Sequence, residues 1–281
     1  MFKTRLISGI ALVVIQLIVL IVRGPLLLGV TGIIAMIGLF EYYRALGLHK
    51  EPAAWCGYIF SAFLYVYVYL GEYGNVAMNA MGGIVKYGSA MLIVLMCFYV
   101  FSYPKYDIRQ IAEIAFGPVY IPFMLLYVNE MSFERGNILV WTIFLTAWGC
   151  DTCAYCAGKL FGKHKMTPVL SPKKTVEGAI GGIAGAFLIN LIFLMIFRTK
   201  SNLDISTTQV VIISILAGAG AFVSMVGDLC ASAIKRNVGI KDYGKIIPGH
   251  GGVMDRFDSI IITAPFMFWM VTTVMQGKFL I

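Results

Sequence analysis

Charge is scarce in this sequence. Asp, Glu, Lys and Arg together make up 13% of the 281 residues, and only three residues are histidines. No polar stretch is long enough to form a separate soluble domain, so we expect no nucleic-acid-binding module and no nucleic-acid partner. The Walker A pattern G-x-x-x-x-G-K-[ST] is also absent, which disfavours a P-loop ATPase.

The six cysteines do not form a persuasive metal-binding pattern. Cys150, Cys153 and Cys156 repeat the C-x2-C-x2-C spacing of iron–sulfur ligands, but they continue an apolar stretch and no fourth Cys-Pro follows. In a helix, this spacing aligns small side chains on adjoining faces. We therefore interpret these cysteines as packing residues, and nothing in the sequence indicates disulfides.

Hydrophobic residues, by contrast, make up 59% of the chain, and its mean hydropathy is +0.85. Apolar segments of membrane-spanning length recur from end to end. We predict an all-α, polytopic integral membrane protein with about nine transmembrane helices. Residues 1–281 would form one membrane domain, with N-terminal helices in 1–147 and a catalytic region in 148–281. The predicted spans are 5–22, 25–43, 55–71, 86–102, 111–128, 137–158, 179–197, 208–232 and 259–277.

The distribution of basic residues predicts the orientation of these spans. If the N-terminus is cytoplasmic, most of the 22 lysines and arginines fall on the cytoplasmic side, including those of segments 159–178 and 235–256. The N-terminal segment has a basic start and an apolar run but no obvious cleavage site. We therefore expect a retained first helix rather than a signal peptide.

Prolines and glycines inside the predicted spans indicate local geometry. Pro118 and Pro122 should bend or unwind span 111–128, because proline lacks the N–H that a helix requires. Span 179–197 begins beside closely spaced glycines, which allow helices to approach each other closely. These glycines are Gly178, Gly181, Gly182 and Gly185.

From residue 148 onward, charges enter the apolar spans. Asp151 lies near the predicted cytoplasmic end of span 137–158, where a carboxylate must be paired, hydrated or bound to a metal. The following loop contains Lys173 and Lys174, after which Thr175 can cap the next helix, with Glu177 in its first turn. The two lysines are either topology signals or binders of an anion at the helix N-terminus.

Residues 227–259, called the signature segment below, hold the densest set of polar groups. Asp228, Ser232 and Lys235 are spaced i, i+4 and i+7, which places them on one helix face. Pro248-Gly-His-Gly-Gly252 follows a basic stretch, and glycines allow backbone N–H groups to approach phosphate oxygens closely. The segment then continues with Asp255, Arg256 and Asp258.

This combination predicts phosphoryl or nucleotidyl transfer assisted by Mg²⁺. Asp255 and Asp258 can join Asp228 in a metal site of hard oxygen ligands, which Mg²⁺ prefers. The surrounding lysines and arginines would neutralise charge on phosphate oxygens. We interpret His250 as a turn residue or a hydrogen-bonding partner of phosphate more readily than as a direct acid or base.

The same residues resemble the phosphatidate cytidylyltransferases, also called CDP-diacylglycerol synthases. The family signature runs S-x-x-K-R-x4-K-D-x-G-x3-P-x-H-G-G-x2-D-R-x-D, and this chain matches it without departure. The Ser-Pro-Lys-Lys-Thr-x-Glu-Gly element before Ala179 also resembles the family, so the strong match covers roughly residues 148–260. The matching signature positions are Ser232, Lys235, Arg236, Lys241, Asp242, Gly244, Pro248, His250, Gly251, Gly252, Asp255, Arg256 and Asp258.

The resemblance implies that CTP and phosphatidic acid are converted to CDP-diacylglycerol and pyrophosphate. It also implies Mg²⁺, a second monovalent cation such as K⁺, a homodimer among membrane lipids, and a cell inner-membrane location with the site facing the cytoplasm. The implied metal ligands are Asp228 and Asp255, with Asp258 and Asp151 as secondary ligands or neighbours. The implied catalytic residues are Ser232, Lys235, Arg236, Lys241, His250 and Arg256, and the implied substrate-binding residues are Lys173, Lys174, Gly251 and Gly252.

Three other functions fit the sequence less well. A CTP-dependent lipid kinase would release CDP, but the full signature match argues against it. The D-G-x2-A-R…G-x3-D-x3-D pattern of CDP-alcohol phosphatidyltransferases is absent. An ion-coupled transporter would be expected to place charges near the middle of the membrane in both halves, whereas here they collect in the C-terminal part and no internal repeat is evident.

Overall fold

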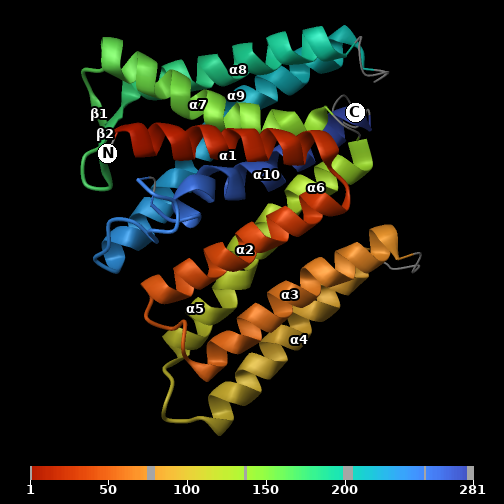
Figure 1. Ribbon diagram of the computed structural model, residues 1–281, viewed down its shortest axis with the longest axis vertical. Helices are drawn as coiled ribbons and strands as arrows, with labels where there is room; N and C mark the ends of the chain where they lie inside the picture. The colour runs from red at the N-terminus through yellow and green to blue at the C-terminus, as the bar shows by residue number, and fades with distance from the viewer. Residues whose placement is uncertain (1, 75–79, 136–137, 199–204, 250, 277–281) are drawn as a thin grey trace. The chain divides into compact units, whose positions relative to one another are not determined.

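A computed structural model describes residues 2–74, 80–135, 138–198, 205–249 and 251–276 of the chain. Most of these residues are helical (Figure 1). The helices are α1 (Phe2–Val22), α2 (Pro25–Ala45), α3 (Pro52–Tyr73), α4 (Ala80–Phe101), α5 (Ile108–Pro118), the π-helical turn η1 (Val119–Phe123), α6 (Met124–Arg135), α7 (Leu139–Phe161), α8 (Val176–Phe197), α9 (Thr207–Asn237) and α10 (Met254–Met275). Two short strands, β1 (Lys165–Thr167) and β2 (Ser171–Thr175), lie between α7 and α8.

Six helical segments in the described part of the chain are long and apolar enough to cross a membrane. They are α2, α3, the continuous segment from α5 to α6, α8, α9 and α10. The described apolar parts of α1 and α4 are shorter, and α7, which carries Asp151, is not among the six. The expectation of a helical, multi-pass membrane protein is confirmed, whereas the count of nine spans and the cytoplasmic N-terminus stay predictions.

The chain packs as two compact units. Unit 1 contains Met1–Leu126 and Ile240–Arg256, and unit 2 contains Tyr127–Gly239 and Phe257–Ile281. Each unit therefore combines a long N-terminal or central part of the chain with a piece of the C-terminal part. The predicted division of the chain at residue 148 rests on sequence character and stays a prediction.

In unit 1, α2 packs on α3 and α5, and α3 lies beside α4 (Figure 1). Pro118 cannot donate a hydrogen bond to the carbonyl of Ile114, four residues earlier. The buried hydroxyl of Tyr43 on α2 donates to that carbonyl instead, at 2.7 Å. The π-helical turn η1 follows directly and contains Pro122. The predicted local unwinding at these prolines is therefore confirmed.

In unit 2, α7, α8 and α9 lie side by side (Figure 1). The close approach of α7 and α8 depends on the glycines of α8, since a Cβ added at Gly182 would lie 3.0 Å from the Sγ of Cys150. Gly185 is likewise in contact with Cys153. The packing interpretation of these glycines and of Cys150 and Cys153 is confirmed.

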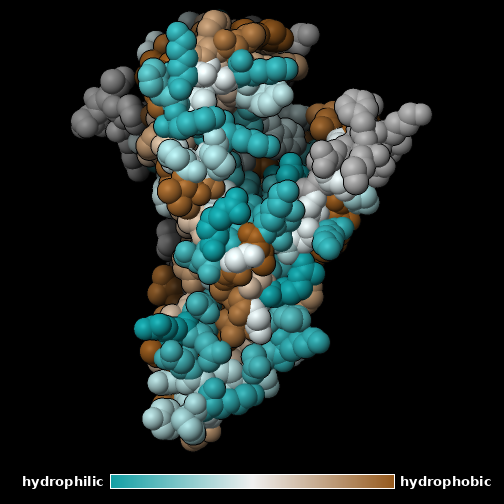
Figure 2. All heavy atoms as spheres, turned by 90° about the vertical axis from the view of Figure 1, so that its left-hand side faces the viewer, coloured by the Kyte–Doolittle hydropathy of each residue, from teal (hydrophilic) through white to brown (hydrophobic). Residues whose placement is uncertain are grey.

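A small hairpin at the end of α7 is absent from the sequence-based expectation, which assigned residues 159–178 to a loop. Its antiparallel strands pair Lys165 with Thr175 and Thr167 with Ser171. Thr175 then caps α8 as predicted, because its Oγ1 accepts a hydrogen bond from the backbone N–H of Gly178 at 3.1 Å. The hairpin lies on the side displayed in Figure 2, where hydrophilic residues are interspersed with apolar ones.

Candidate active site

Asp228 and Ser232 share one face of α9 in unit 2, as their spacing predicts. The Ser232 hydroxyl donates a long hydrogen bond of 3.5 Å to Asp228 Oδ1. The other oxygen, Oδ2, lies 2.6 Å from the ammonium of Lys174 on β2. This is an ion pair without a well-directed hydrogen bond, since Lys174 Nζ has no partner of hydrogen-bonding geometry among the residues that the structure describes. The Asp228 and Lys174 side chains are both only partly exposed, which limits screening of their attraction by water.

Asp258 on α10 lies near this pair. It is buried, and its Oδ1 accepts a hydrogen bond from the backbone N–H of Ser259 at 2.8 Å. Gly227 explains the approach of α9 and α10, since a Cβ there would lie 2.9 Å from the carbonyl oxygen of Asp258. The charged groups within electrostatic range of Asp258 are Asp228, Lys235 and Asp151. Unit 2 therefore gathers three of the four predicted metal-site carboxylates.

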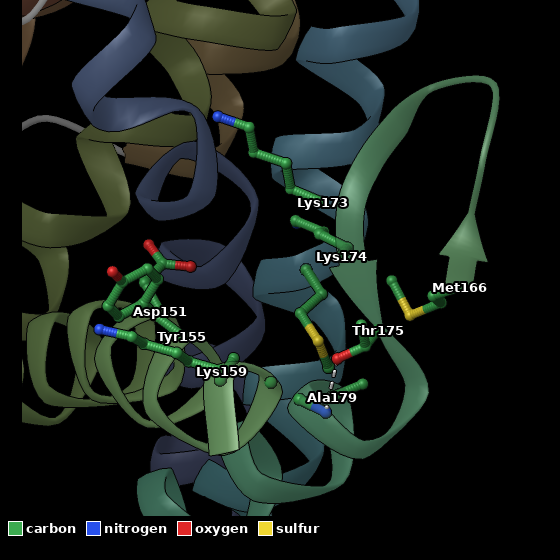
Figure 3. A pocket seen from close by; sticks show the side chains of 12 residues that line it. Asp151, Tyr155, Lys159, Met166, Lys173, Lys174, Thr175 and Ala179 are labelled. Carbon is green, nitrogen blue, oxygen red and sulfur yellow. Dashed lines mark hydrogen bonds between the residues drawn. The ribbon is translucent and has the colours of Figure 1, made fainter. Parts of the chain in front are cut away.

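A cavity of about 300 Å³ adjoins these charges in unit 2. Figure 3 shows that Asp151 and Tyr155 reach it from α7, and that Lys173 and Lys174 come from β2. Lys159, Met166 and small residues of α7 and α8 complete much of its wall. The cavity therefore combines cationic groups with apolar surface, which suits an amphipathic phosphate ester. The two lysines that the sequence could assign either to topology or to anion binding both line it.

The glycine-rich part of the signature segment belongs to unit 1. Gly249 and Gly251 adopt positive φ angles of 77° and 91°, which favour glycine. The carboxylate of Asp255 organises this turn, because its Oδ2 accepts hydrogen bonds from the N–H of Tyr243 at 2.8 Å and of Gly252 at 2.9 Å. The Gly252 N–H therefore bonds to protein rather than pointing toward open space.

The remaining predicted site residues differ in exposure. Lys235 is partly buried on α9, whereas Arg236, Lys241 and Arg256 are exposed. His250 lies outside the described residues. Asp255 is buried in unit 1, and its predicted participation in the metal site formed by Asp228 stays a prediction.

The carboxylates of unit 2 are better suited to an Mg²⁺ ion that substrate phosphates also coordinate than to one held by protein ligands alone. Among the residues that the structure describes, no three His, Cys, Asp or Glu side chains are arranged to hold a metal ion. Mg²⁺, however, is usually held by one or two carboxylates together with substrate phosphates and waters. Asp228 and Asp258 provide two hard oxygen donors on adjacent helices. Their like charges also favour a cation between them.

Glu41 of α2 is a buried charged residue that is not among the site residues predicted from the sequence. This carboxylate lies within predicted span 25–43, is completely buried, and accepts a hydrogen bond from the N–H of Met254 at 2.8 Å. A charge inside an apolar span is itself a signal of function. The position of Glu41 within an apolar span is therefore the feature of the sequence that marks it as a candidate.

Comparison with known proteins places the whole chain in one family. The model of the cytidylyltransferase family matches residues 3–274. A phosphatidate cytidylyltransferase of Staphylococcus haemolyticus is 30% identical over 268 residues, covering 94% of this chain and 97% of that protein. One from Haemophilus influenzae is 30% identical over 285 residues, covering 95% and 97%. One from Staphylococcus saprophyticus is 36% identical over 178 residues, covering 63% and 65%. With its charged cavity and complete signature segment, the chain belongs to the phosphatidate cytidylyltransferase family of enzymes.

Proposed function

We propose that this protein transfers the cytidylyl group of CTP to phosphatidate, forming CDP-diacylglycerol and pyrophosphate. The names of its relatives support this reaction. The observation that carries it in the structure is the pairing of Asp228 with Lys174 beside a cavity that has both cationic and apolar walls. Such a cavity suits a lipid phosphate, whose head group is anionic and whose chains are apolar.

The chemistry requires positioning and charge neutralisation more than proton transfer. A phosphatidate oxygen, already ionised near neutral pH, attacks the α-phosphorus of CTP in line. A new P–O bond forms as the bond from the α-phosphorus to the bridging oxygen breaks, and pyrophosphate leaves with that electron pair. Lys173 and Lys174 would hold one phosphate group at the cavity, and Lys235, Arg236 and Lys241 would bind another. Ser232 would orient the Asp228 carboxylate.

We further propose that Asp228 and Asp258 hold Mg²⁺, with Asp151 as a neighbour. The metal would neutralise phosphate oxygens and lower the repulsion between two anionic reactants. Asp255 as a further ligand, a monovalent cation such as K⁺, and a homodimer belong to the same proposal through the family resemblance. Catalytic or substrate-binding roles for His250, Arg256, Gly251 and Gly252 rest on the same signature.

The proposed reaction suits a membrane interface. Acyl chains can stay in the bilayer while the lipid phosphate reaches the basic residues, and CTP can arrive from water. We propose that this interface is the cytoplasmic face of the cell inner membrane, because most lysines and arginines fall on that side of the predicted topology.

The test is a two-substrate assay with the full chain purified in detergent. We expect CTP and phosphatidate together, but neither alone, to give a lipid with the mass of CDP-diacylglycerol and one pyrophosphate per turnover. Chelation of Mg²⁺ should abolish turnover, and added Mg²⁺ should restore it. Release of CDP with phosphorylation of a lipid alcohol would instead identify a kinase. Turnover that is indifferent to chelators would overturn the metal assignment.

A further inference from the structure

Glu41 extends from the N-terminal part of the chain into the turn that precedes α10, all within unit 1. Its side chain is completely buried. Oε2 accepts the hydrogen bond from Met254 N, while Oε1 has no hydrogen-bond partner in the described structure. The N–H of Val253 and the charge of Arg44 also favour this carboxylate, but they offset only part of the cost of burying it. Such a cost is accepted where the group has a role beyond packing.

Two glycines of the signature segment pack directly against this carboxylate. A Cβ added at Gly252 would lie 2.5 Å from Glu41 Oε2, and one added at Gly244 would overlap Oε1. The Cα of Gly252 also lies only 2.9 Å from the Cβ position of Gly244. The absence of side chains at these positions therefore makes the space that Glu41 fills. The glycines have a packing reason in addition to any contact with phosphate.

Arg44, one helical turn after Glu41, makes a second contact with the same turn. Its Nη2 donates to the carbonyl oxygen of Tyr243 at 2.5 Å, while the N–H of Tyr243 bonds to Asp255. Both polar groups of the Tyr243 backbone unit are thus held, one from α2 and one from α10. The turn is tied to two helices rather than lying loose between them.

The end of α2 that carries these two residues is itself anchored. Tyr43 donates to the carbonyl of Ile114 at 2.7 Å, and Tyr42 donates to the carbonyl of Glu113 at 3.4 Å, both on α5. Rigid supports of this kind are what fix a site to within the fraction of an ångström that catalysis requires.

We propose that Glu41 is a positioning residue for the cytidylyl transfer, acting with Arg44. It holds the backbone at Tyr243, Gly252 and Met254 in the arrangement that lets Asp255 serve as a metal ligand and lets the exposed Lys241 and Arg256 bind phosphate groups. Glu41 itself touches no substrate. The expected effect of Glu41 on turnover rests on the proposed function. Its expected effect on the stability of the turn does not.

The structural consequence is tested by limited trypsin digestion of the full chain in detergent, with cleavage sites resolved by mass spectrometry. Lys241 and Lys245 are exposed on either side of the buried Tyr243 and Gly244. In Glu41→Ala, we expect cleavage at these two lysines to accelerate by about tenfold or more, because the turn opens without global unfolding. Cleavage at Lys163, which is exposed just before β1 in unit 2, is the internal reference and should not change.

The catalytic consequence is tested by comparing Glu41→Ala with Glu41→Gln. Gln keeps an oxygen that can accept a hydrogen bond from the Met254 N–H. Glu41→Gln should therefore resist trypsin at Lys241 and Lys245 as the wild type does, and its kcat should fall by less than about fivefold. Glu41→Ala should lose about 100-fold in kcat, with a smaller change in the KM for CTP. Glu113→Ala, which removes a partly buried carboxylate from α5, is the matched control and should keep both protection and kcat.

Three results would overturn the proposal. One is unchanged cleavage at Lys241 and Lys245 in Glu41→Ala. Another is loss of kcat in Glu41→Gln as large as in Glu41→Ala, which would indicate that the charge rather than the hydrogen bond matters. The third is an equal rise in cleavage at Lys163, which would indicate general unfolding. If wild-type protein fails to cytidylate phosphatidate, the proposed function is wrong, while the digestion result still decides the role of Glu41 in the turn.

Discussion

Asp228 and Asp255 belong to the same signature segment, yet their carboxylates are used differently. Asp228, in unit 2, faces the side-chain ammonium of Lys174 and a hydroxyl that donates only a long hydrogen bond. Asp255, in unit 1, accepts two backbone N–H groups at 2.8 and 2.9 Å. A lysine side chain can rotate away when a ligand arrives, whereas a backbone N–H moves only if the chain moves. Asp228 is therefore suited to exchanging partners, and Asp255 to holding the chain.

The largest effect is expected for Asp228→Asn. Removing this charge would weaken both the cation site and the attraction for Lys174, and we expect turnover to fall by about 1,000-fold or more. Cytidylyl transfer by the purified variant measures this, and thermal unfolding in detergent should stay close to wild type. Cys230→Ala, an exposed change on the same helix, is the matched control. Near-normal turnover in Asp228→Asn would refute its role in metal binding.

Asp255→Asn separates charge from chain geometry. The amide oxygen can still accept from Tyr243 and Gly252, so we expect trypsin protection at Lys241 and Lys245 to persist. If the charge is also needed at the site, turnover should nevertheless fall by at least about 100-fold. Retention of turnover together with protection would limit Asp255 to a structural role and remove it from the predicted metal ligands.

Lys174→Gln removes the ammonium that pairs with Asp228 and tests whether it competes with Mg²⁺ for this carboxylate. We expect turnover to fall by about 10- to 100-fold, because a cation that can contact substrate phosphate is lost. At the same time, less Mg²⁺ should be needed for half-maximal activity, because an ammonium no longer competes for Asp228. Magnesium titrations of the two proteins measure this shift. Lys163→Gln, an exposed lysine outside the cavity, should alter neither value, and a higher Mg²⁺ requirement in Lys174→Gln would contradict the competition.

The smallest effect is expected at Glu51, a partly exposed carboxylate in the turn between α2 and α3. A hydrogen bond from Tyr106 (2.7 Å) and the ammonium of Lys105 (3.1 Å) lower the pKa of Glu51. A lowered folded-state pKa adds stability above the ordinary value of 4.5, and this stability is lost as the pH falls through the folded pKa.

Glu51→Gln should therefore destabilise unit 1 at pH 7 by less than about 1 kcal/mol, since water screens an exposed pair. The difference from wild type should shrink as the pH falls below 4.5. Unfolding by denaturant at several pH values checks both statements. Turnover at pH 7 should not change, in contrast to Glu41→Ala. A stability difference between Glu51→Gln and wild type that grows as the pH falls would contradict the lowered pKa of Glu51.

Much of the helical architecture was readable from sequence, because apolar length and helix-breaking residues act locally. The local unwinding at Pro118 and Pro122 and the Thr175 cap were both expected for this reason. The hairpin was missed, because strands of three and five residues carry too little periodicity to predict. The sequence also did not indicate that Lys235 is partly buried while Arg236 and Lys241 are exposed. Exposure depends on which helix faces pack against each other.

The sequence by itself determined the membrane class and the approximate helices, and it predicted the residue types of the proposed metal- and phosphate-binding site. Each of these follows from composition or from spacing along one helix. Only the tertiary structure decided that Lys174 pairs with Asp228, that α9 and α10 approach closely at Gly227, and that Glu41 accepts a hydrogen bond from Met254 at the start of α10. The physical reason is that these contacts join residues far apart in the chain, and their geometry depends on how side chains of different helices fill shared space.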